Sequence, residues 1–96
     1  MATKTVSLNK NGISKLPNDK SVLYNIMTPG GRINYTGIAK RGRVQERITE
    51  HLSGAKDPIP GCTVRIEQHS SIEAARNKEI RVIARNKPRY NKQGKE

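Results

Sequence analysis

The sequence has no tryptophan or phenylalanine, and its three aromatic residues are all tyrosines. Apolar residues make up only 32% of the 96 residues. A chain of this length and composition has room for one small domain, whose core must be built from Ile, Val, Leu and Ala. We therefore expect a single domain with a modest core in which aromatic side chains are rare.

Cysteine is almost absent, since Cys62 is the only one. A single cysteine excludes an intramolecular disulfide and a thiolate metal cluster, and it suits the cytoplasm, where we expect the protein to act. We interpret Cys62 as a small buried hydrophobic residue. No apolar run approaches the ~18 residues of a membrane span, and the N-terminus lacks a signal-peptide core, so we expect no membrane partner.

Acidic residues are scarce: eight Asp and Glu are present with nineteen Lys and Arg, for a net charge of +11. This excess favours a polyanionic partner, because each phosphate that a protein neutralises releases condensed counterions. We therefore expect nucleic acid as the partner. Charge alone leaves open a basic protein without such a partner, or a ribosomal-type RNA binder.

Hydrophobic periodicity and turn signals predict three strands and two helices. The expected strands are Ser21–Met27, Arg32–Ala39 and Cys62–Gln68, and the expected helices are Arg43–Leu52 and Ser71–Asn86. Thr28-Pro29-Gly30-Gly31 predicts a hairpin turn between the first two strands. The order ββαβα predicts an α+β fold, with a three-stranded antiparallel sheet flanked by helices.

The two ends of the chain are polar and carry most of the turn-forming residues outside the hairpin. Residues 1–20 predict a basic, loosely ordered N-terminal arm with at most one helical turn at Gly12–Lys15. Residues 21–91 form the expected domain, and residues 92–96 the expected mobile, charged tail.

The second expected helix carries a carboxylate within its apolar face. At 100° per residue, that face contains Ile72, Ala75, Ile80, Val82 and Ile83. Glu79 falls near its middle, where a carboxylate is unfavourable unless it is paired or metal-bound. Two interpretations stay open: Glu79 is a metal ligand, or it is a buried partner of an arginine.

The first expected helix carries a basic stripe, because Arg43, Arg47 and His51 recur at intervals of four residues. Glu46 and Glu50 lie away from this stripe, so its charge is expected to be uncompensated on the helix. Such a row is a candidate phosphate clamp. The alternatives are a solvated basic face and a histidine at a helix edge.

The expected hairpin places Tyr24 and Tyr35 on opposite strands, where they can lie near one another on one face. Two tyrosines in a small sheet are normally core residues. Gly37, inside a strand pattern, predicts close approach of another backbone or of a ligand.

Together these segments resemble the GIY-YIG nuclease family, over Leu16–Asn91. Val22-Leu23-Tyr24 is similar to the first signature of that family, and Tyr35-Thr36-Gly37 is similar to the second. The other positions that carry the resemblance are Arg47 with His51 four residues later, Glu79, and Asn91. The order and spacing of the motifs match the family, although each motif alone is degenerate.

The resemblance implies a GIY-YIG fold and an endonuclease that hydrolyses DNA phosphodiester bonds through one Mg²⁺ or Mn²⁺ ion. Glu79 would be the only protein ligand of the metal, which suits an ion that keeps its waters. Arg47 would stabilise charge on the scissile phosphate. Tyr24 and Tyr35 would align the attacking water, with Tyr24 as general base, and His51 would hydrogen-bond within this set. A phenol, with a pKa of about 10, would need the metal and nearby cations to lower that pKa.

Further roles follow from the same resemblance. Gly37 and Asn91 would brace the site, and nucleic acid would be bound by Lys40, Arg41, Arg43 and Arg47. Ile38 follows Gly37 where some relatives carry lysine, so Lys40 or Arg41 would have to substitute for it.

Because the family's catalytic domain usually works with a separate recognition module, a DNA-targeting subunit is an implied partner. Two alternatives stay open. One is a non-catalytic nucleic-acid-binding module that retains the fold, and the other is an interaction subunit of a larger enzyme.

Overall fold

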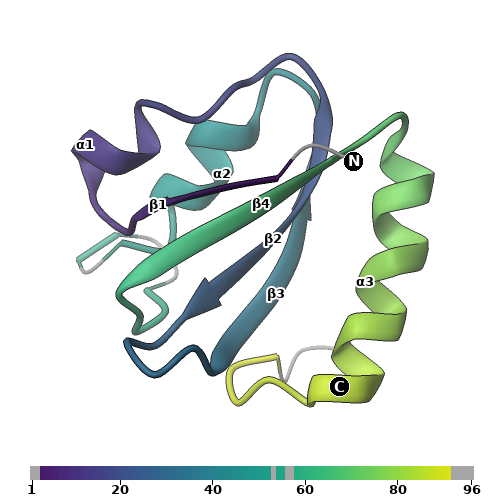
Figure 1. Cartoon of the computed structure of the whole chain (residues 1–96). Helices are drawn as coiled ribbons and strands as arrows, with labels where there is room; N and C mark the ends of the chain where they lie inside the picture. The colour runs from purple at the N-terminus through teal and green to yellow at the C-terminus, as the bar shows by residue number, and fades with distance from the viewer. Residues whose placement is uncertain (1–2, 53, 56–57, 92–96) are drawn as a thin grey trace.

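The computed structural model describes residues 3–52, 54–55 and 58–91. Within them, four antiparallel strands form one sheet in the order β1-β4-β2-β3. The strands are β1 (Thr3–Ser7), β2 (Ser21–Met27), β3 (Ile33–Ala39) and β4 (Thr63–His69), and the helices are α1 (Lys10–Ile13), α2 (Val44–Thr49) and α3 (Ile72–Asn86). Helices α1 and α2 lie on one side of the sheet and α3 on the other (Figure 1). The α+β class is confirmed.

The expected number of strands is wrong, because the segment interpreted as a loosely ordered arm supplies β1 and α1. Strand β1 pairs with β4 and places Val6 opposite Val64. Beyond it, Ile13 and Leu16 are each only 2% exposed. A Cβ at Gly12 would collide with the Ser7 carbonyl, so the chain needs glycine where α1 folds back on β1. The expected tail at 92–96 lies outside the described residues.

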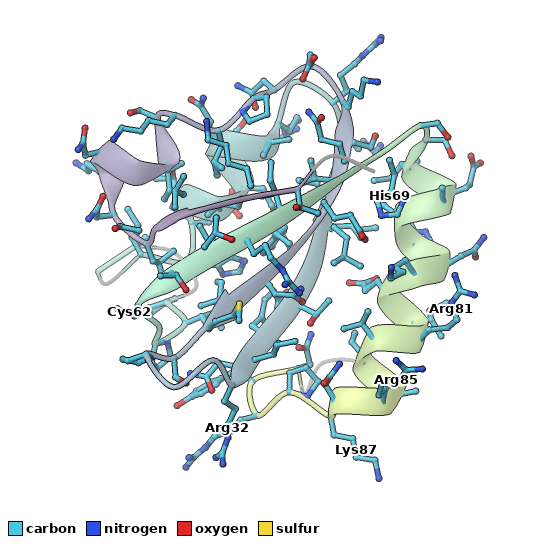
Figure 2. All side chains as sticks on the ribbon, in the orientation of Figure 1. Arg32, Cys62, His69, Arg81, Arg85 and Lys87 are labelled. Carbon is cyan, nitrogen blue, oxygen red and sulfur yellow. The ribbon has the colours of Figure 1, made fainter. Side chains whose placement is uncertain are left out.

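Helix α3 begins and ends at the signals present in the sequence. The Ser71 hydroxyl accepts a hydrogen bond from the Ala74 amide at 3.1 Å, and Lys87 ends the helix with φ 44°. The predicted apolar face is partly wrong, because Ile80 is 61% exposed and only Ala75 is fully buried. Ile80 lies 100° around the helix from Glu79, and the sheet covers a narrower stripe than that. Figure 2 shows Arg81 on the outer side of α3.

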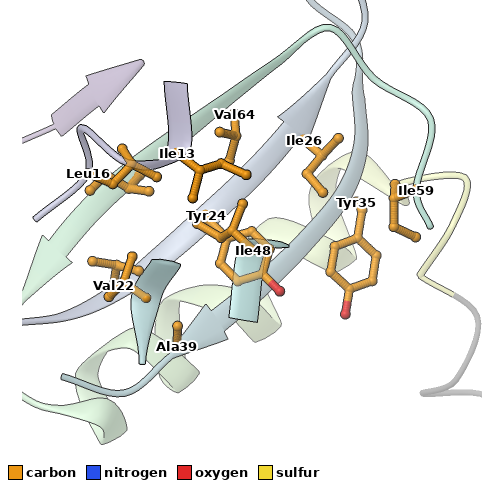
Figure 3. Packing of buried hydrophobic residues seen from close by; sticks show 12 residues of the cluster. Ile13, Leu16, Val22, Tyr24, Ile26, Tyr35, Ala39, Ile48, Ile59 and Val64 are labelled. Atoms are coloured by element: carbon orange, nitrogen blue, oxygen red, sulfur yellow. The ribbon is translucent and has the colours of Figure 1, made fainter. Parts of the chain in front are cut away.

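The main core lies between the sheet and helices α1 and α2 (Figure 3). Alternate residues of β2 and β4 point into it, namely Val22, Tyr24, Ile26, Val64 and Ile66. Val44 and Ile48 of α2 cover them and are fully buried. Cys62 was expected to point inward but is exposed, because β4 begins one residue after it.

The opposite face of the sheet, which α3 partly covers, carries several polar groups beside the buried Leu23. Thr36 donates to Asn25 at 2.7 Å between β3 and β2. Glu67 of β4 lies 3.0 Å from His69 and 3.4 Å from Lys78 of α3. Burial tends to raise the pKa of Glu67, but the hydrogen bond from His69 and the charge of Lys78 outweigh it and lower that pKa. Within the described residues, no helix is long and apolar enough to cross a lipid bilayer.

We predict that Leu16→Ala lowers the free energy of unfolding by about 2–5 kcal/mol, because it empties a core position supplied by the N-terminal segment. Urea denaturation measures the change. Ile80→Ala is the matched control at an exposed position, where a change within about 0.5 kcal/mol is expected. Equal effects of the two substitutions would show that the N-terminal segment is not part of the folded core.

Candidate active site

Two tyrosines and a histidine form a buried aromatic cluster on the α2 side of the sheet. The Tyr24 hydroxyl lies 2.7 Å from Nε2 of His51, and both residues are 0% exposed. The centroid of the Tyr35 ring lies 4.8 Å from the centroid of the His51 ring and 6.1 Å from that of the Tyr24 ring. Figure 3 shows the two phenol oxygens pointing to the same side. The fold therefore brings Tyr24 together with Tyr35 and His51, which lie 11 and 27 residues after it in the sequence.

Gly37 makes this cluster possible. It pairs with Tyr24 across the β2–β3 hairpin, and the Tyr24 ring lies over it. A Cβ at position 37 would lie 2.6 Å from the Tyr24 hydroxyl oxygen and 2.9 Å from Cε2 of Tyr35. Close approach at Gly37 was expected from another backbone or a ligand, whereas the structure places two tyrosine rings there. A side chain at this position would displace at least one ring.

Arg47 and Glu79 reach the same place from opposite sides of the sheet. Arg47 leaves α2 and Glu79 leaves α3, and β3 is the edge strand between them. Both charges act on the Tyr24 hydroxyl, since Arg47 lowers its pKa and Glu79 raises it. Arg47 also acts on Glu79 itself. Burial raises the pKa of Glu79, and the charges of Arg76 and Arg47 lower it. The net pKa of Glu79 is raised, so its ionised form is disfavoured by its surroundings.

The basic stripe on α2 is not uncompensated, contrary to expectation. Arg43 lies 3.2 Å from Glu46, and Arg47 lies 2.9 Å from Glu50. Residues three apart on a helix are neighbours, and the glutamates reach the arginines along that spacing. The Arg43–Glu46 pair is largely solvent-exposed and therefore weak, whereas Glu50 in the second pair is half-buried.

The Tyr24 phenol is a poor acid in these surroundings. Burial raises its pKa far above the ordinary value of 10.0, the neighbouring Tyr35 raises it further, and Arg47 only partly opposes this. Arg47 thus acts in the expected direction but is outweighed. Tyr24 therefore retains its proton at neutral pH in this state, and the His51 nitrogen 2.7 Å away is the group placed to exchange it.

Asn91 holds the strand that carries Tyr35 and Gly37. Its side-chain oxygen accepts from the Thr36 amide at 2.7 Å, and its nitrogen donates to the Thr36 carbonyl at 2.8 Å. The Tyr90 amide adds a bond to the Asn34 carbonyl at 2.9 Å. The segment after α3 therefore pairs with the outer edge of β3 and fixes the position of the aromatic cluster.

Glu79 is the carboxylate in this cluster that a metal ion could use. In the described part of the chain its oxygens form no ion pair or hydrogen bond, and they face the positive charges of Arg47 and Arg76. No group of three or more His, Cys, Asp or Glu residues gathers among the described residues. A single carboxylate fits Mg²⁺, which retains several waters and takes phosphate oxygens as ligands. It does not fit a structural zinc ion.

A hollow of about 290 Å³ adjoins Arg47 at the same edge of the sheet. Lys40 and Arg43, two of the residues predicted to bind nucleic acid, line it together with Arg76. Arg41 does not line it, because its side chain belongs to a separate hollow beside His69. Sequence reasoning missed Arg76, although its position three residues before Glu79 on the same helix was a usable signal.

Comparison of the sequence with protein-family models gives no match, and no curated protein is significantly similar to it.

Proposed function

We propose that the chain is a metal-dependent endonuclease domain that hydrolyses phosphodiester bonds of DNA, with one Mg²⁺-type ion bound at Glu79. The observation that carries this proposal is the convergence of five polar side chains at the edge of β3. They come from β2, β3, α2 with the turn after it, and α3, and they are Tyr24, Tyr35, Arg47, His51 and Glu79. A stable core requires no such gathering, since polar groups in a core are unfavourable unless bonded.

Neutralisation of the negative charge on the scissile phosphate is the first requirement of the reaction. Arg47 supplies a permanent guanidinium beside the Tyr24 hydroxyl and can bind two phosphate oxygens at once. When bound, Mg²⁺ supplies further neutralisation of the phosphate and lowers the pKa of a coordinated water. Glu79 is disfavoured as a free anion at its position, so a cation there relieves an unfavourable charge.

Removal of a proton from the attacking water is the second requirement. Tyr24 is not a free phenolate, because burial raises its pKa. Its hydroxyl can accept a proton from water while it donates its own to Nε2 of His51, 2.7 Å away. Tyr24 and His51 then act as one relay: the proton ends on His51 as an imidazolium, and Tyr24 never becomes a stable phenolate. Tyr35 packs against both rings and fixes their orientation.

A second candidate is a non-catalytic nucleic-acid-binding module with the same fold. The raised pKa of Tyr24 favours it, because a buried phenol that keeps its proton can have a packing role alone. Both candidates predict binding that weakens steeply with salt. They differ in cleavage, so assays of cleavage decide between them.

We predict that Glu79→Gln lowers Mg²⁺- or Mn²⁺-dependent nicking of supercoiled DNA by at least about a hundredfold, because the metal ligand is lost. DNA binding should stay equal or strengthen, since a negative charge near the phosphate is removed. The melting temperature should stay equal or rise: the raised pKa of Glu79 means that its ionised form opposes folding. Nicking, binding and thermal unfolding are measured on the same preparation.

Glu73→Gln is the control for this variant, because it removes the same charge from an exposed position on α3. It should leave nicking unchanged. A Glu79→Gln variant that melts at a lower temperature would indicate a structural ion pair instead, and a folded variant that still nicks would end the metal-site proposal.

We also predict that Tyr24→Phe lowers nicking by about a hundredfold, because it removes one oxygen from the relay to His51. The loss of that hydrogen bond should lower the free energy of unfolding by about 1 kcal/mol. Single-turnover cleavage and urea denaturation measure the two effects. Tyr90→Phe, at the tyrosine outside the aromatic cluster, is the control and should retain full nicking. Unchanged nicking by Tyr24→Phe would rule out the relay.

A further inference from the structure

The hollow beside Arg47 has the composition of a phosphate site. Four cationic side chains line it, namely Lys40, Arg43, Arg47 and Arg76, and no carboxylate lines it among the described residues. Arg43 and Arg47 each have a glutamate partner, whereas Lys40 and Arg76 form no ion pair within the described part of the chain. Three elements contribute these charges, so the excess is produced by the fold and does not belong to one helix face.

The remaining lining of the hollow is apolar. Ile38 and Ala39 of β3 form one side, and Ile72 at the start of α3 forms another. Charged side chains around an apolar surface suit one unit of a nucleic-acid strand, whose sugar is apolar on one side and whose phosphate is anionic. A volume of about 290 Å³ is at the lower end of the range for ligand pockets, which fits one such unit.

The position of the hollow relates it to the proposed metal ligand. Arg76 precedes Glu79 by three residues on α3, a rise of about 4.5 Å along the helix axis, and Ile72 is about 10 Å from Glu79 on the same scale. Arg47 lines the hollow and also acts on Tyr24. A strand whose scissile phosphate lies at Glu79 and Arg47 would therefore place a neighbouring phosphate within reach of Arg76.

We propose that this hollow binds the backbone phosphate next to the scissile one, with Lys40, Arg43 and Arg76 as its contacts. This assignment rests on the proposed nuclease function for the identity of the neighbouring phosphate. Arg76 is then a substrate-binding residue whose charge also lowers the pKa of Glu79, against the larger effect of burial. The substrate must extend beyond the cleaved bond on the side facing the N-terminal end of α3.

Interference mapping with neutral linkages tests the assignment. A pool of end-labelled DNA carries on average one methylphosphonate per strand, and each cut is located relative to the neutral position. The native chain should disfavour a neutral linkage at one fixed position beside the cut by about tenfold, the equivalent of a charged hydrogen bond. Arg76→Ala should weaken this depletion, because Lys40 and Arg43 remain as contacts. The pattern is normalised to total cleavage, so a slower enzyme does not alter it.

Arg81→Ala is the matched control, because it removes an equal charge from the outer side of the same helix (Figure 2). It should retain the depletion. The same depletion in Arg76→Ala as in the native chain would overturn the subsite.

A binding measurement separates failure of the subsite from failure of the nuclease proposal. Without metal, the slope of log K against log salt for a DNA duplex should fall by about 0.9 in Arg76→Ala and by less in Arg81→Ala. A chain that never cuts DNA but shows this difference has the phosphate site without the activity. Equal slopes in the two variants would rule out the proposed phosphate site, whether or not the chain cuts DNA.

Discussion

The absence of a side chain at Gly37 is the constraint on which the candidate site depends. Only there does β3 leave room for the Tyr24 ring to cross over the neighbouring strand, with its hydroxyl where a Cβ would otherwise lie at 2.6 Å. That position brings the hydroxyl to His51 and within the influence of Arg47 and Glu79. Asn91 hydrogen-bonds the backbone of Thr36 at the other edge of the same strand, so β3 keeps its position beside the Tyr24 ring.

The sheet then provides two different faces that meet at this edge. One face is apolar and buries Tyr24 against α2, and the other carries several polar groups and is partly covered by α3. Because β3 is an edge strand, groups from both faces reach past it, and the charge of Arg47 from α2 acts on Glu79 from α3. An interior strand would keep these groups apart. The edge position therefore allows charged groups from both faces to gather at one side of the sheet.

The sequence predicted much of the fold and the main members of the cluster. The mostly apolar segment Ser21–Met27 defines β2 with its observed bounds, and the capping serine defines the start of α3. Strand β1 was missed because its residues are mostly polar, and it is defined by pairing with β4, a contact distant in sequence. Ile80 and Cys62 were misplaced because periodicity alone does not show where the covering surface ends. The place of Arg76 in the lining of the hollow depends on how β3, α2 and α3 pack together, which the sequence alone does not show.

Binding of a metal ion at Glu79 is the central claim, and paramagnetic broadening by Mn²⁺ tests it most directly. In the amide NMR spectrum of the native chain, substoichiometric Mn²⁺ should broaden signals around Glu79, including those of Gly37 and Arg47 from the other elements. Glu79→Gln should remove this localised effect while the rest of the spectrum stays unchanged. Broadening that persists in Glu79→Gln, or that centres on Glu67 and His69 instead, would contradict the account.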